Sequence, residues 1–368
     1  MTKLKNKNTG KISLWKKIKF ILFITIVSLV FFIILSETYL AIFNPQPYLY
    51  PRLSYSEKYR KIPPENVTMV HCVPPHKRYY SVNQYNLRGK VIPLSNEYDK
   101  SNIILLGDSF TFGIGVNDGN EYAAIMANNL KSKFNIINTG CGGWGLTQQI
   151  RRFYEFGQLY NPEIVLLLFS GNDPDDNLKD NCTRIENDRF VFSNFYKEDN
   201  LSVYWLNKLL SKSIIQKSNL YMVISRIIWP LVKKNQINET KYNYEGTIKH
   251  TKSTIPLKEN LYNELLNLFA KDLHEKEITF YFMSVNSYSE NKISYQLDKF
   301  PYIKENVLRL NTLGLIDYIN INEWFTKDDF VSSPVSHYDK RWNFVLGENL
   351  AKHILNSRTI GQSTHADN

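Results

Sequence analysis

The fold is decided by the stretch Ile103-Ile104-Leu105-Leu106-Gly107-Asp108-Ser109-Phe110-Thr111-Phe112-Gly113. The stretch begins as an apolar run and breaks abruptly into Gly-Asp-Ser. Four consecutive apolar residues bounded by glycine predict a strand that is buried on both faces of a parallel sheet. Ligands of such sheets bind outside the carboxyl ends of the strands. Ser109 therefore stands where a nucleophile can act, although Asp and Ser are also common caps of the helix that follows a strand.

From residue 102 onward, apolar strand patterns alternate with helical ones. The predicted strands cover 103–106, 134–138, 164–169, 278–285 and 315–321, and the predicted helices cover 121–131, 146–160, 257–275, 303–313 and 342–355. This alternation predicts βαβ units with right-handed crossovers. We expect a three-layer α/β/α domain over residues 101–357, with a parallel sheet of about five strands in flavodoxin-like order. A helical insertion at about 201–254 is expected either to cover the sheet, to form a lid or to lie on a membrane.

The N-terminal region predicts a membrane anchor. Residues 1–19 hold seven lysines and no acid, and the run from Phe20 to Ser36 is uncharged and apolar. These seventeen residues span about 25 Å as a helix, near the lower limit for crossing a bilayer. We expect an uncleaved transmembrane helix over 20–43 because no clean cleavage site follows it, a cleaved signal peptide being the alternative. The lysines place residues 1–19 in the cytoplasm and the body of the chain outside it.

Two further segments lack a sustained period. Residues 44–100 are rich in Pro, Tyr, Asn and Lys and predict an irregular stalk that packs on the main domain. Residues 358–368 are small and polar and predict a disordered tail.

The remaining composition excludes some classes of protein. The net charge of +10 comes largely from the N-terminal lysines, since the chain beyond Phe43 carries 38 basic and 34 acidic residues. We therefore expect no nucleic-acid binding. The chain has three cysteines without a C-x-x-C pair, and His71, Cys72 and His76 lack a fourth ligand, so no metal or organic cofactor is implied.

Polar sequences follow each of the first three predicted strands. Gly107-Asp108-Ser109 follows the first, a glycine-rich turn from Asn138 to Gly145 follows the second, and Ser170-Gly171-Asn172-Asp173 follows the third. These strand ends converge on one edge of a doubly wound sheet. Acyl transfer through serine needs a nucleophile, a base and hydrogen-bond donors for the oxyanion. The glycine-rich turn offers backbone N–H groups and the asparagine offers a side-chain amide, although turns and helix caps account for the same residue types.

This ordered succession resembles the SGNH/GDSL hydrolase superfamily, with the match running from about Asn102 to Asn177. Asn86-Leu87-Arg88-Gly89 also resembles membrane-anchored members. The resemblance implies that Ser109 is the nucleophile, with its backbone N–H as one oxyanion donor. It implies further that Gly143 and Asn172 supply the other donors.

The base is less directly marked. The resemblance implies a histidine just before the last helix, and the only histidine there is His337. Pro334, not Asp, stands three residues before it. An alternative alignment through Asp339-Lys340-Arg341-Trp342 puts Arg341 in the histidine position, and arginine cannot act as a base at neutral pH. We expect His337 to be the base, oriented by Asp339, Asp329, Asp328 or a backbone carbonyl, and His353 to be a packing residue.

The expected function is ester hydrolysis through a Ser109 acyl-enzyme. The absence of glycine at position 111 argues against the nucleophile elbow of the α/β-hydrolase fold. The resemblance implies acyl esters of an extracytoplasmic glycan or lipid as substrates. Two alternatives remain at this point: an O-acyltransferase of envelope carbohydrates that uses the same residues, and a catalytically silent binding module.

Overall fold

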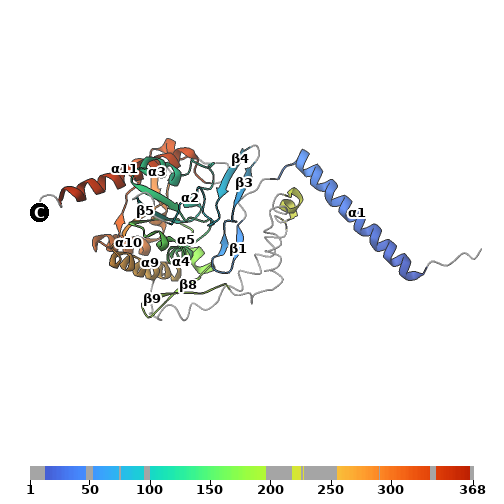
Figure 1. Ribbon diagram of the computed structural model, residues 1–368, viewed down its shortest axis with the longest axis horizontal. Coiled ribbons are helices and arrows are strands. Elements are labelled where there is room, and N and C mark those ends of the chain that lie inside the picture. The colour runs from blue at the N-terminus through green and yellow to red at the C-terminus, as the bar shows by residue number, and fades with distance from the viewer. Residues whose placement is uncertain are drawn as a thin grey trace, which may run out of the picture.

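A five-stranded parallel sheet forms the centre of the computed structural model (Figure 1). Its strands are β5 (Ser101–Gly107), β6 (Phe134–Asn138), β7 (Ile164–Phe169), β10 (Thr279–Ser284) and β13 (Asp317–Tyr318). They are ordered β13-β10-β7-β5-β6, so the first strand lies between the second and the third. This is the flavodoxin-like order, and it confirms the predicted fold class. The structure describes residues 13–46, 53–73, 76–94, 100–195, 218–224, 227, 255–289, 291–331 and 337–364.

Helices cover both faces of the sheet and make the three layers (Figure 1). One face carries α3 (Tyr122–Leu130) and α11 (Lys340–Thr364), which pack on each other. The other face carries α4 (Leu146–Glu155), α5 (Asp173–Lys179), α9 (Leu257–Glu275) and α10 (Pro301–Thr312).

The central strands are fully enclosed by these layers. Ile103 to Leu106 and Val165 to Phe169 have no exposed surface. Burial on both faces explains why their sequences are continuous apolar runs instead of alternating ones. In the parallel register Gly107 of β5 lies opposite Leu168 of β7, and Ser284 of β10 lies opposite Phe169. The loops that follow these strands therefore start at the same edge of the sheet.

The region predicted as an irregular stalk contains two antiparallel hairpins, which corrects that prediction. They are formed by β1 (Ser54–Ser56) with β2 (Arg60–Ile62) and by β3 (Val67–Val73) with β4 (His76–Val82). β1, β2 and β4 are short or largely polar, and the apolar residues of β3 do not alternate strictly with polar ones, so the sequence shows no clear strand pattern here. Two further hairpins outside the main sheet were also not predicted: β8 (Thr183–Glu186) with β9 (Arg189–Phe192), and β11 (Asn286–Ser289) with β12 (Lys292–Tyr295).

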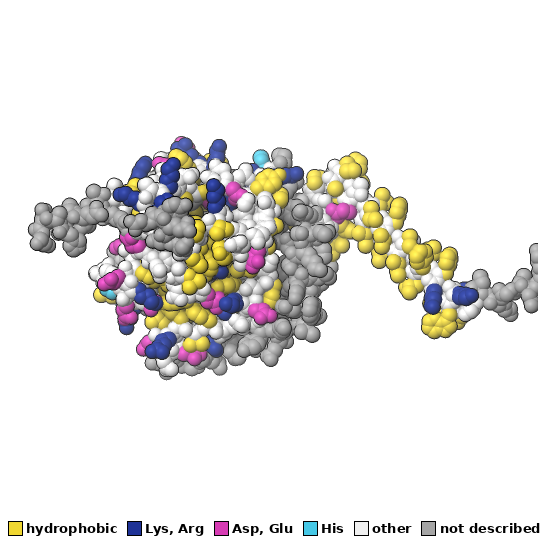
Figure 2. Space-filling view, viewed as in Figure 1, with side chains coloured by type: hydrophobic (Ala, Val, Ile, Leu, Met, Phe, Trp, Pro, Cys, Tyr) yellow, Lys and Arg dark blue, Asp and Glu magenta, His cyan; other side chains and the backbone are white. Residues whose placement is uncertain are grey.

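One helix within the described residues, α1 (Leu14–Phe43), is long and apolar enough to cross a bilayer. Its most apolar window has a mean hydropathy of 2.9, and none of that window is buried against the protein. Figure 2 shows apolar side chains along this helix and basic side chains at its N-terminal end. The helix begins before Phe20 and continues without a break through Glu37.

Glu37 joins this helix to the insertion. Its carboxylate accepts hydrogen bonds from Ser218 Oγ at 2.8 Å, from the Asn219 backbone at 2.7 Å and from the Leu220 backbone at 2.9 Å. Residues 219–224 are helical, so Glu37 caps the start of a helix. Most of the predicted helical insertion lies outside the described residues.

The C-terminal helix is longer than the sequence indicates. Helix α11 continues to Thr364, whereas the prediction ended the helix near Leu355 and made 358–368 a disordered tail. The polar residues of this extension give no apolar period, which is why the helix end was set too early.

Candidate active site

A tight turn at the end of β5 presents Ser109. Asp108 precedes the short helix α2 (Ser109–Phe112), and its carboxylate accepts a hydrogen bond from the Phe110 backbone at 2.9 Å. The turn requires Gly107, because a β-carbon there would lie 2.1 Å from Thr111 Oγ1. Ser109 is the first residue of α2, where backbone N–H groups have no acceptor within the helix. The turn therefore places Ser109 at the edge of the sheet with a backbone N–H that has no acceptor within α2.

His337 approaches this serine from the C-terminal part of the chain. Its Nε2 lies 2.9 Å from Ser109 Oγ, and its ring packs against Phe110 with the ring centroids 5.1 Å apart. A neutral imidazole nitrogen can accept the hydroxyl proton at this distance. The structure thus brings together the serine and the histidine that the sequence separates by more than two hundred residues.

Asp108 is the acidic side chain next to this pair. Its carboxylate is almost fully buried and lies 3.3 Å from Ser109 Oγ. Burial raises the pKa of Asp108, while the Phe110 N–H and the charge of His337 act in the opposite direction. Asp108 and His337 therefore interact electrostatically, and the charge of His337 favours the charged form of Asp108.

The glycine-rich turn after β6 lies directly beside Ser109. A β-carbon at Gly142 would lie 3.9 Å from Ser109 Cβ. Its neighbour Gly143 has a φ of +71°, a left-handed conformation that favours glycine. Asn138 ties this turn to the nucleophile turn, because its side chain donates to Thr111 O at 2.7 Å and accepts from Gly140 N at 3.0 Å. The two turns are therefore held as one unit.

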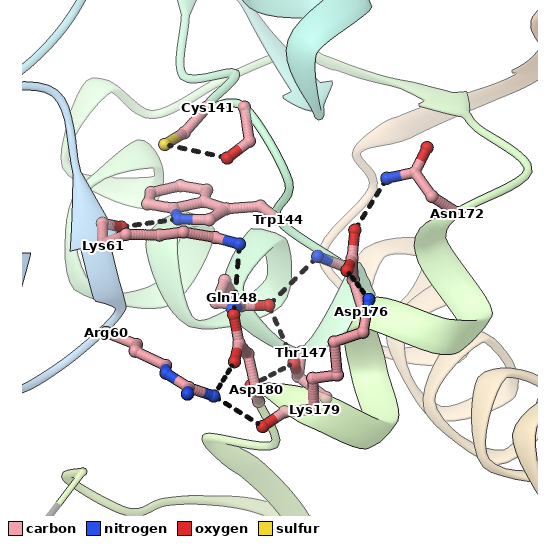
Figure 3. Close-up of polar contacts among 12 residues, drawn as sticks. Arg60, Lys61, Cys141, Trp144, Thr147, Gln148, Asn172, Asp176, Lys179 and Asp180 are labelled. Atoms are coloured by element: carbon pink, nitrogen blue, oxygen red, sulfur yellow. Dashed lines mark hydrogen bonds and ion pairs between the residues drawn. The ribbon is translucent and has the colours of Figure 1, made fainter. Parts of the chain in front are cut away.

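Asn172 lies at the end of β7 with its amide held on both sides. Its Oδ1 accepts from Ser170 Oγ at 2.7 Å, and its Nδ2 donates to Asp176 Oδ2 at 2.7 Å. A carboxylate only accepts, so this pairing fixes which end of the amide is the donor. Figure 3 shows the amide nitrogen of Asn172 turned toward Asp176. The nitrogen carries two hydrogens, and the Asn172 side chain also hydrogen-bonds to Asp108, which favours the charged form of that carboxylate.

The orienting role expected for Asp339 does not fit its position. Its Oδ1 accepts from Arg341 N at 2.8 Å and so caps the start of α11, and within the described residues it makes no hydrogen bond to His337. Asp329 is held by Thr326 and by Arg341, whose Nε lies 2.7 Å from Asp329 Oδ1. Asp328 is exposed. Of the three carboxylates proposed as partners of His337, Asp339 caps a helix and Asp329 pairs with Arg341.

Arg341 and His353 also have defined places. The guanidinium of Arg341 is bound to Asp329, and it is His337 instead that reaches Ser109. His353 packs between the rings of Tyr281 and Trp324, at centroid distances of 5.6 and 6.3 Å.

Two basic residues near the site were not identified from the sequence. Arg88 is buried, and its guanidinium donates to the carbonyl oxygens of Phe112 and Val116 at 3.0 and 2.8 Å. It thereby fixes the chain that leaves the nucleophile turn. The sequence signal was the Asn-Leu-Arg-Gly stretch, which was noted without a role.

Lys61, on β2, is the second of these basic residues. Its Nζ would lie only 2.7 Å from a β-carbon at Gly143. The sequence of residues 44–100 contains nothing that indicates this approach.

Comparison with known proteins agrees with the motifs. Residues 105–233 match the model of the GDSL-like lipase/acylhydrolase family. A search of curated proteins gave no match. The matched segment, which is less than half of the chain, is similar to a GDSL-like lipase/acylhydrolase domain, and the Gly-Asp-Ser turn lies within it. The resemblance and the enzyme class predicted from the sequence are confirmed.

Solved structures with distant similarity include three esterases. Esterase EstA from Pseudoalteromonas sp. is 10% identical, with 71% of this chain and 100% of that chain covered and a TM-score of 0.40. A lipase/acylhydrolase from Enterococcus faecalis is 12% identical, with 69% and 95% covered and a TM-score of 0.37. A carbohydrate esterase family 2 enzyme from Corynascus thermopiles is 13% identical, with 77% and 76% covered and a TM-score of 0.39.

Proposed function

We propose that this protein hydrolyses carboxylic esters through an acyl-enzyme on Ser109. The observation that carries the proposal is the 2.9 Å separation between Ser109 Oγ and His337 Nε2. A serine hydroxyl is a weak nucleophile unless a base accepts its proton during attack. A catalytically silent binding module has no need of this alignment.

In the first half of the reaction, Ser109 Oγ attacks the carbonyl carbon of the ester and its proton passes to His337 Nε2. The carbonyl oxygen becomes an oxyanion, which accepts hydrogen bonds from the N–H groups of Ser109 and Gly143 and from the Asn172 amide. The bond to the alcohol oxygen then breaks, and the alcohol leaves with the proton from His337. Asp108 stabilises the imidazolium that exists between these steps.

In the second half, water replaces the alcohol. His337 accepts a proton from the attacking water, the tetrahedral intermediate forms again, and Ser109 Oγ leaves as a hydroxyl with that proton. The products are a carboxylic acid and the free enzyme. Each proton that leaves Ser109 or water is held by His337, so the cycle needs no further base.

The substrate class follows from the position of the chain in the cell. We infer that α1 anchors the protein in a membrane with its basic N-terminus in the cytoplasm and the esterase domain outside it. The esters that such an enzyme meets are carried by extracytoplasmic glycans or lipids, and we propose these as substrates.

The test uses the full chain in detergent micelles with 4-nitrophenyl acetate, acetylated polysaccharides and short-chain acylglycerols. We expect release of free carboxylic acid that depends on Ser109. Transfer of the acyl group to an added sugar or glycerol, with no release to water, is the result that identifies a transferase. Turnover of none of these esters, together with an unmodified Ser109 after treatment with a fluorophosphonate, would overturn the proposal.

A further inference from the structure

We propose that Lys61 forms a binding subsite for an anionic group of the substrate, next to the scissile ester. The proposal rests on the function proposed above and names a property of its substrate. Lys61 lies on β2, outside the sheet that supplies Ser109, Gly143 and Asn172. The subsite is therefore separate from the three sequence motifs that follow the strands of the main sheet.

The ammonium group of Lys61 lies against the proposed oxyanion glycine. A β-carbon at Gly143 would be 2.7 Å from Lys61 Nζ, 3.4 Å from Lys61 Cε and 4.0 Å from Asp176 Oδ2. The side chain of Lys61 thus occupies the space that only a glycine leaves open. A substrate whose carbonyl oxygen reaches Gly143 N–H also comes close to this positive charge.

The position of Lys61 is fixed by the residue that follows Gly143. The buried Trp144 donates from Nε1 to Lys61 O at 2.8 Å, and its ring stacks on that of Tyr59 with centroids 5.1 Å apart. Tyr59 OH in turn donates to Glu155 at 2.8 Å. Figure 3 shows the Lys61 side chain running along the indole of Trp144 with its amine directed toward Asp180. These contacts between the hairpin and the glycine-rich turn therefore fix the position of Lys61 beside Gly143.

The carboxylate that pairs with Lys61 is shared with a second cation. Asp180, whose carboxylate is 4% exposed, is paired with both Arg60 and Lys61, the latter at 3.3 Å. Asp176 is paired with Lys179 at 3.0 Å. Because Arg60 already neutralises Asp180, the charge of Lys61 is available to a further anion.

Lys61 is also accessible. Its side chain is 31% exposed, and an ammonium group has three donors, of which Asp180 takes one. A compact ammonium binds carboxylate or phosphate oxygens without demanding one fixed geometry. The ligand chemistry is therefore a carboxylate or phosphate oxygen within a few ångströms of the scissile carbonyl, on either the acyl half or the alcohol half of the ester.

The test compares matched esters with the full chain in detergent. For the acyl half, 4-nitrophenyl hemisuccinate is compared with 4-nitrophenyl butyrate. For the alcohol half, 3-acetoxybenzoate is compared with its methyl ester. We expect the wild type to prefer the anionic member of at least one pair, and that pair identifies the half that carries the charge.

The variants are Lys61→Met, Lys61→Arg and, as a matched control, Lys58→Met. Lys58 belongs to the same hairpin region but is 57% exposed and pairs with Glu155. Lys61→Met should lower the ratio of kcat/KM for anionic over neutral ester about tenfold or more, mainly through KM, as expected for a lost hydrogen bond to a charged group. Lys61→Arg should keep most of the preference, and Lys58→Met should leave it unchanged.

Two results would overturn the subsite: no anionic preference in the wild type, or an unchanged ratio in Lys61→Met. If the Lys61→Met protein fails to fold, the wild type alone is tested. Its preference for the anionic ester over the neutral ester should fall as the salt concentration rises from about 0.02 M to about 0.5 M. A preference independent of salt would then contradict the proposal. Failure of the subsite leaves hydrolysis of the neutral esters intact, whereas failure of the proposed function removes all hydrolysis.

Discussion

The edge of the sheet and the segments packed against it contribute to the site in different ways. Ser109, Gly143 and Asn172 lie in the turns that follow parallel strands of the sheet, so the backbone of the core fixes where these turns start. His337 and Lys61 belong to segments outside the sheet and are positioned by side-chain contacts, to Phe110 and to Trp144 respectively. The first group forms the motif shared with GDSL hydrolases, whereas the second depends on how distant parts of this chain pack. We therefore expect the sheet edge to supply the nucleophile and the oxyanion donors. The packed segments should activate the nucleophile through His337 and select the substrate through Lys61.

The largest effect should follow from Ser109→Ala, which removes the nucleophile. Hydrolysis of 4-nitrophenyl acetate should fall about 10⁴-fold or more, with the residual rate coming from the oxyanion donors and binding. The thermal midpoint should stay close to that of the wild type, because Ser109 is only partly buried and its hydroxyl caps nothing. Retained turnover in a pure preparation would remove Ser109 from its proposed role.

His337→Ala tests how much the segment outside the sheet contributes to catalysis, because it leaves Ser109 and the oxyanion donors at the sheet edge in place. We expect kcat/KM to fall 10²-fold or more, since general-base catalysis typically contributes about that much. In the wild type, activity should decrease toward acid pH because an imidazolium has no lone pair to accept the serine proton, and the variant should lose this acid limb.

Arg341→His is the matched comparison for this prediction. If His337→Ala is nearly silent and Arg341→His raises activity, the alternative alignment is correct and His337 is not the base.

Asn172→Ala removes one donor from the sheet edge while leaving the serine and the histidine in place. Loss of one oxyanion donor typically lowers kcat about 10²–10³-fold, and we expect a loss at the lower end, because Asn172 is exposed and its amide is shared with Asp176. KM should change little. Asn129→Ala, an asparagine on α3 outside the site, serves as the control, and an equal loss in both variants would exclude a specific role for Asn172.

The smallest effect should come from Arg341→Gln. Although burial acts to raise it, hydrogen bonds from Thr326 and Arg341 hold the pKa of Asp329 below its usual value. An Asp with a lowered pKa stabilises the fold above about pH 4, and this contribution is lost as the pH falls through the lowered pKa. The variant should therefore show a slightly lower thermal midpoint at pH 7, a difference that shrinks in strong acid, and unchanged kcat. A large loss of activity would instead place Arg341 in the catalytic machinery.

The sequence predicted the sheet well because its strands are enclosed on both faces. Ile103 to Leu106 and Ile164 to Phe169 have to be apolar at every position, and such runs are easy to detect. The polar residues after them were predicted to meet because parallel strand ends share an edge. Local sequence was sufficient for this part of the molecule.

The packed segments could not be predicted in the same way. β4 reads His-Lys-Arg-Tyr-Tyr-Ser-Val, and Tyr80 is buried because the hairpin packs against Phe112 and Ile114, which are distant in sequence. The approach of Lys61 to Gly143 depends on the hydrogen bond from Trp144 Nε1 to Lys61 O, which joins residues that are 83 positions apart in the sequence. Asp339 was one of the residues expected to orient His337, but its carboxylate caps α11. Contacts of this kind are set by tertiary packing, and the spacing of apolar residues along the sequence does not predict them.

The central claim is that His337 activates Ser109, and the rate of fluorophosphonate labelling tests it most directly. In this reaction a Ser109 Oγ–phosphorus bond forms, fluoride leaves, and the serine proton passes to His337. Intact-mass and peptide mass spectrometry of the full chain should show a single adduct on Ser109. The labelling rate should fall about 10²-fold or more in His337→Ala and remain unchanged in Arg341→Gln. An adduct on another residue, or equal labelling rates in wild type and His337→Ala, would contradict the account.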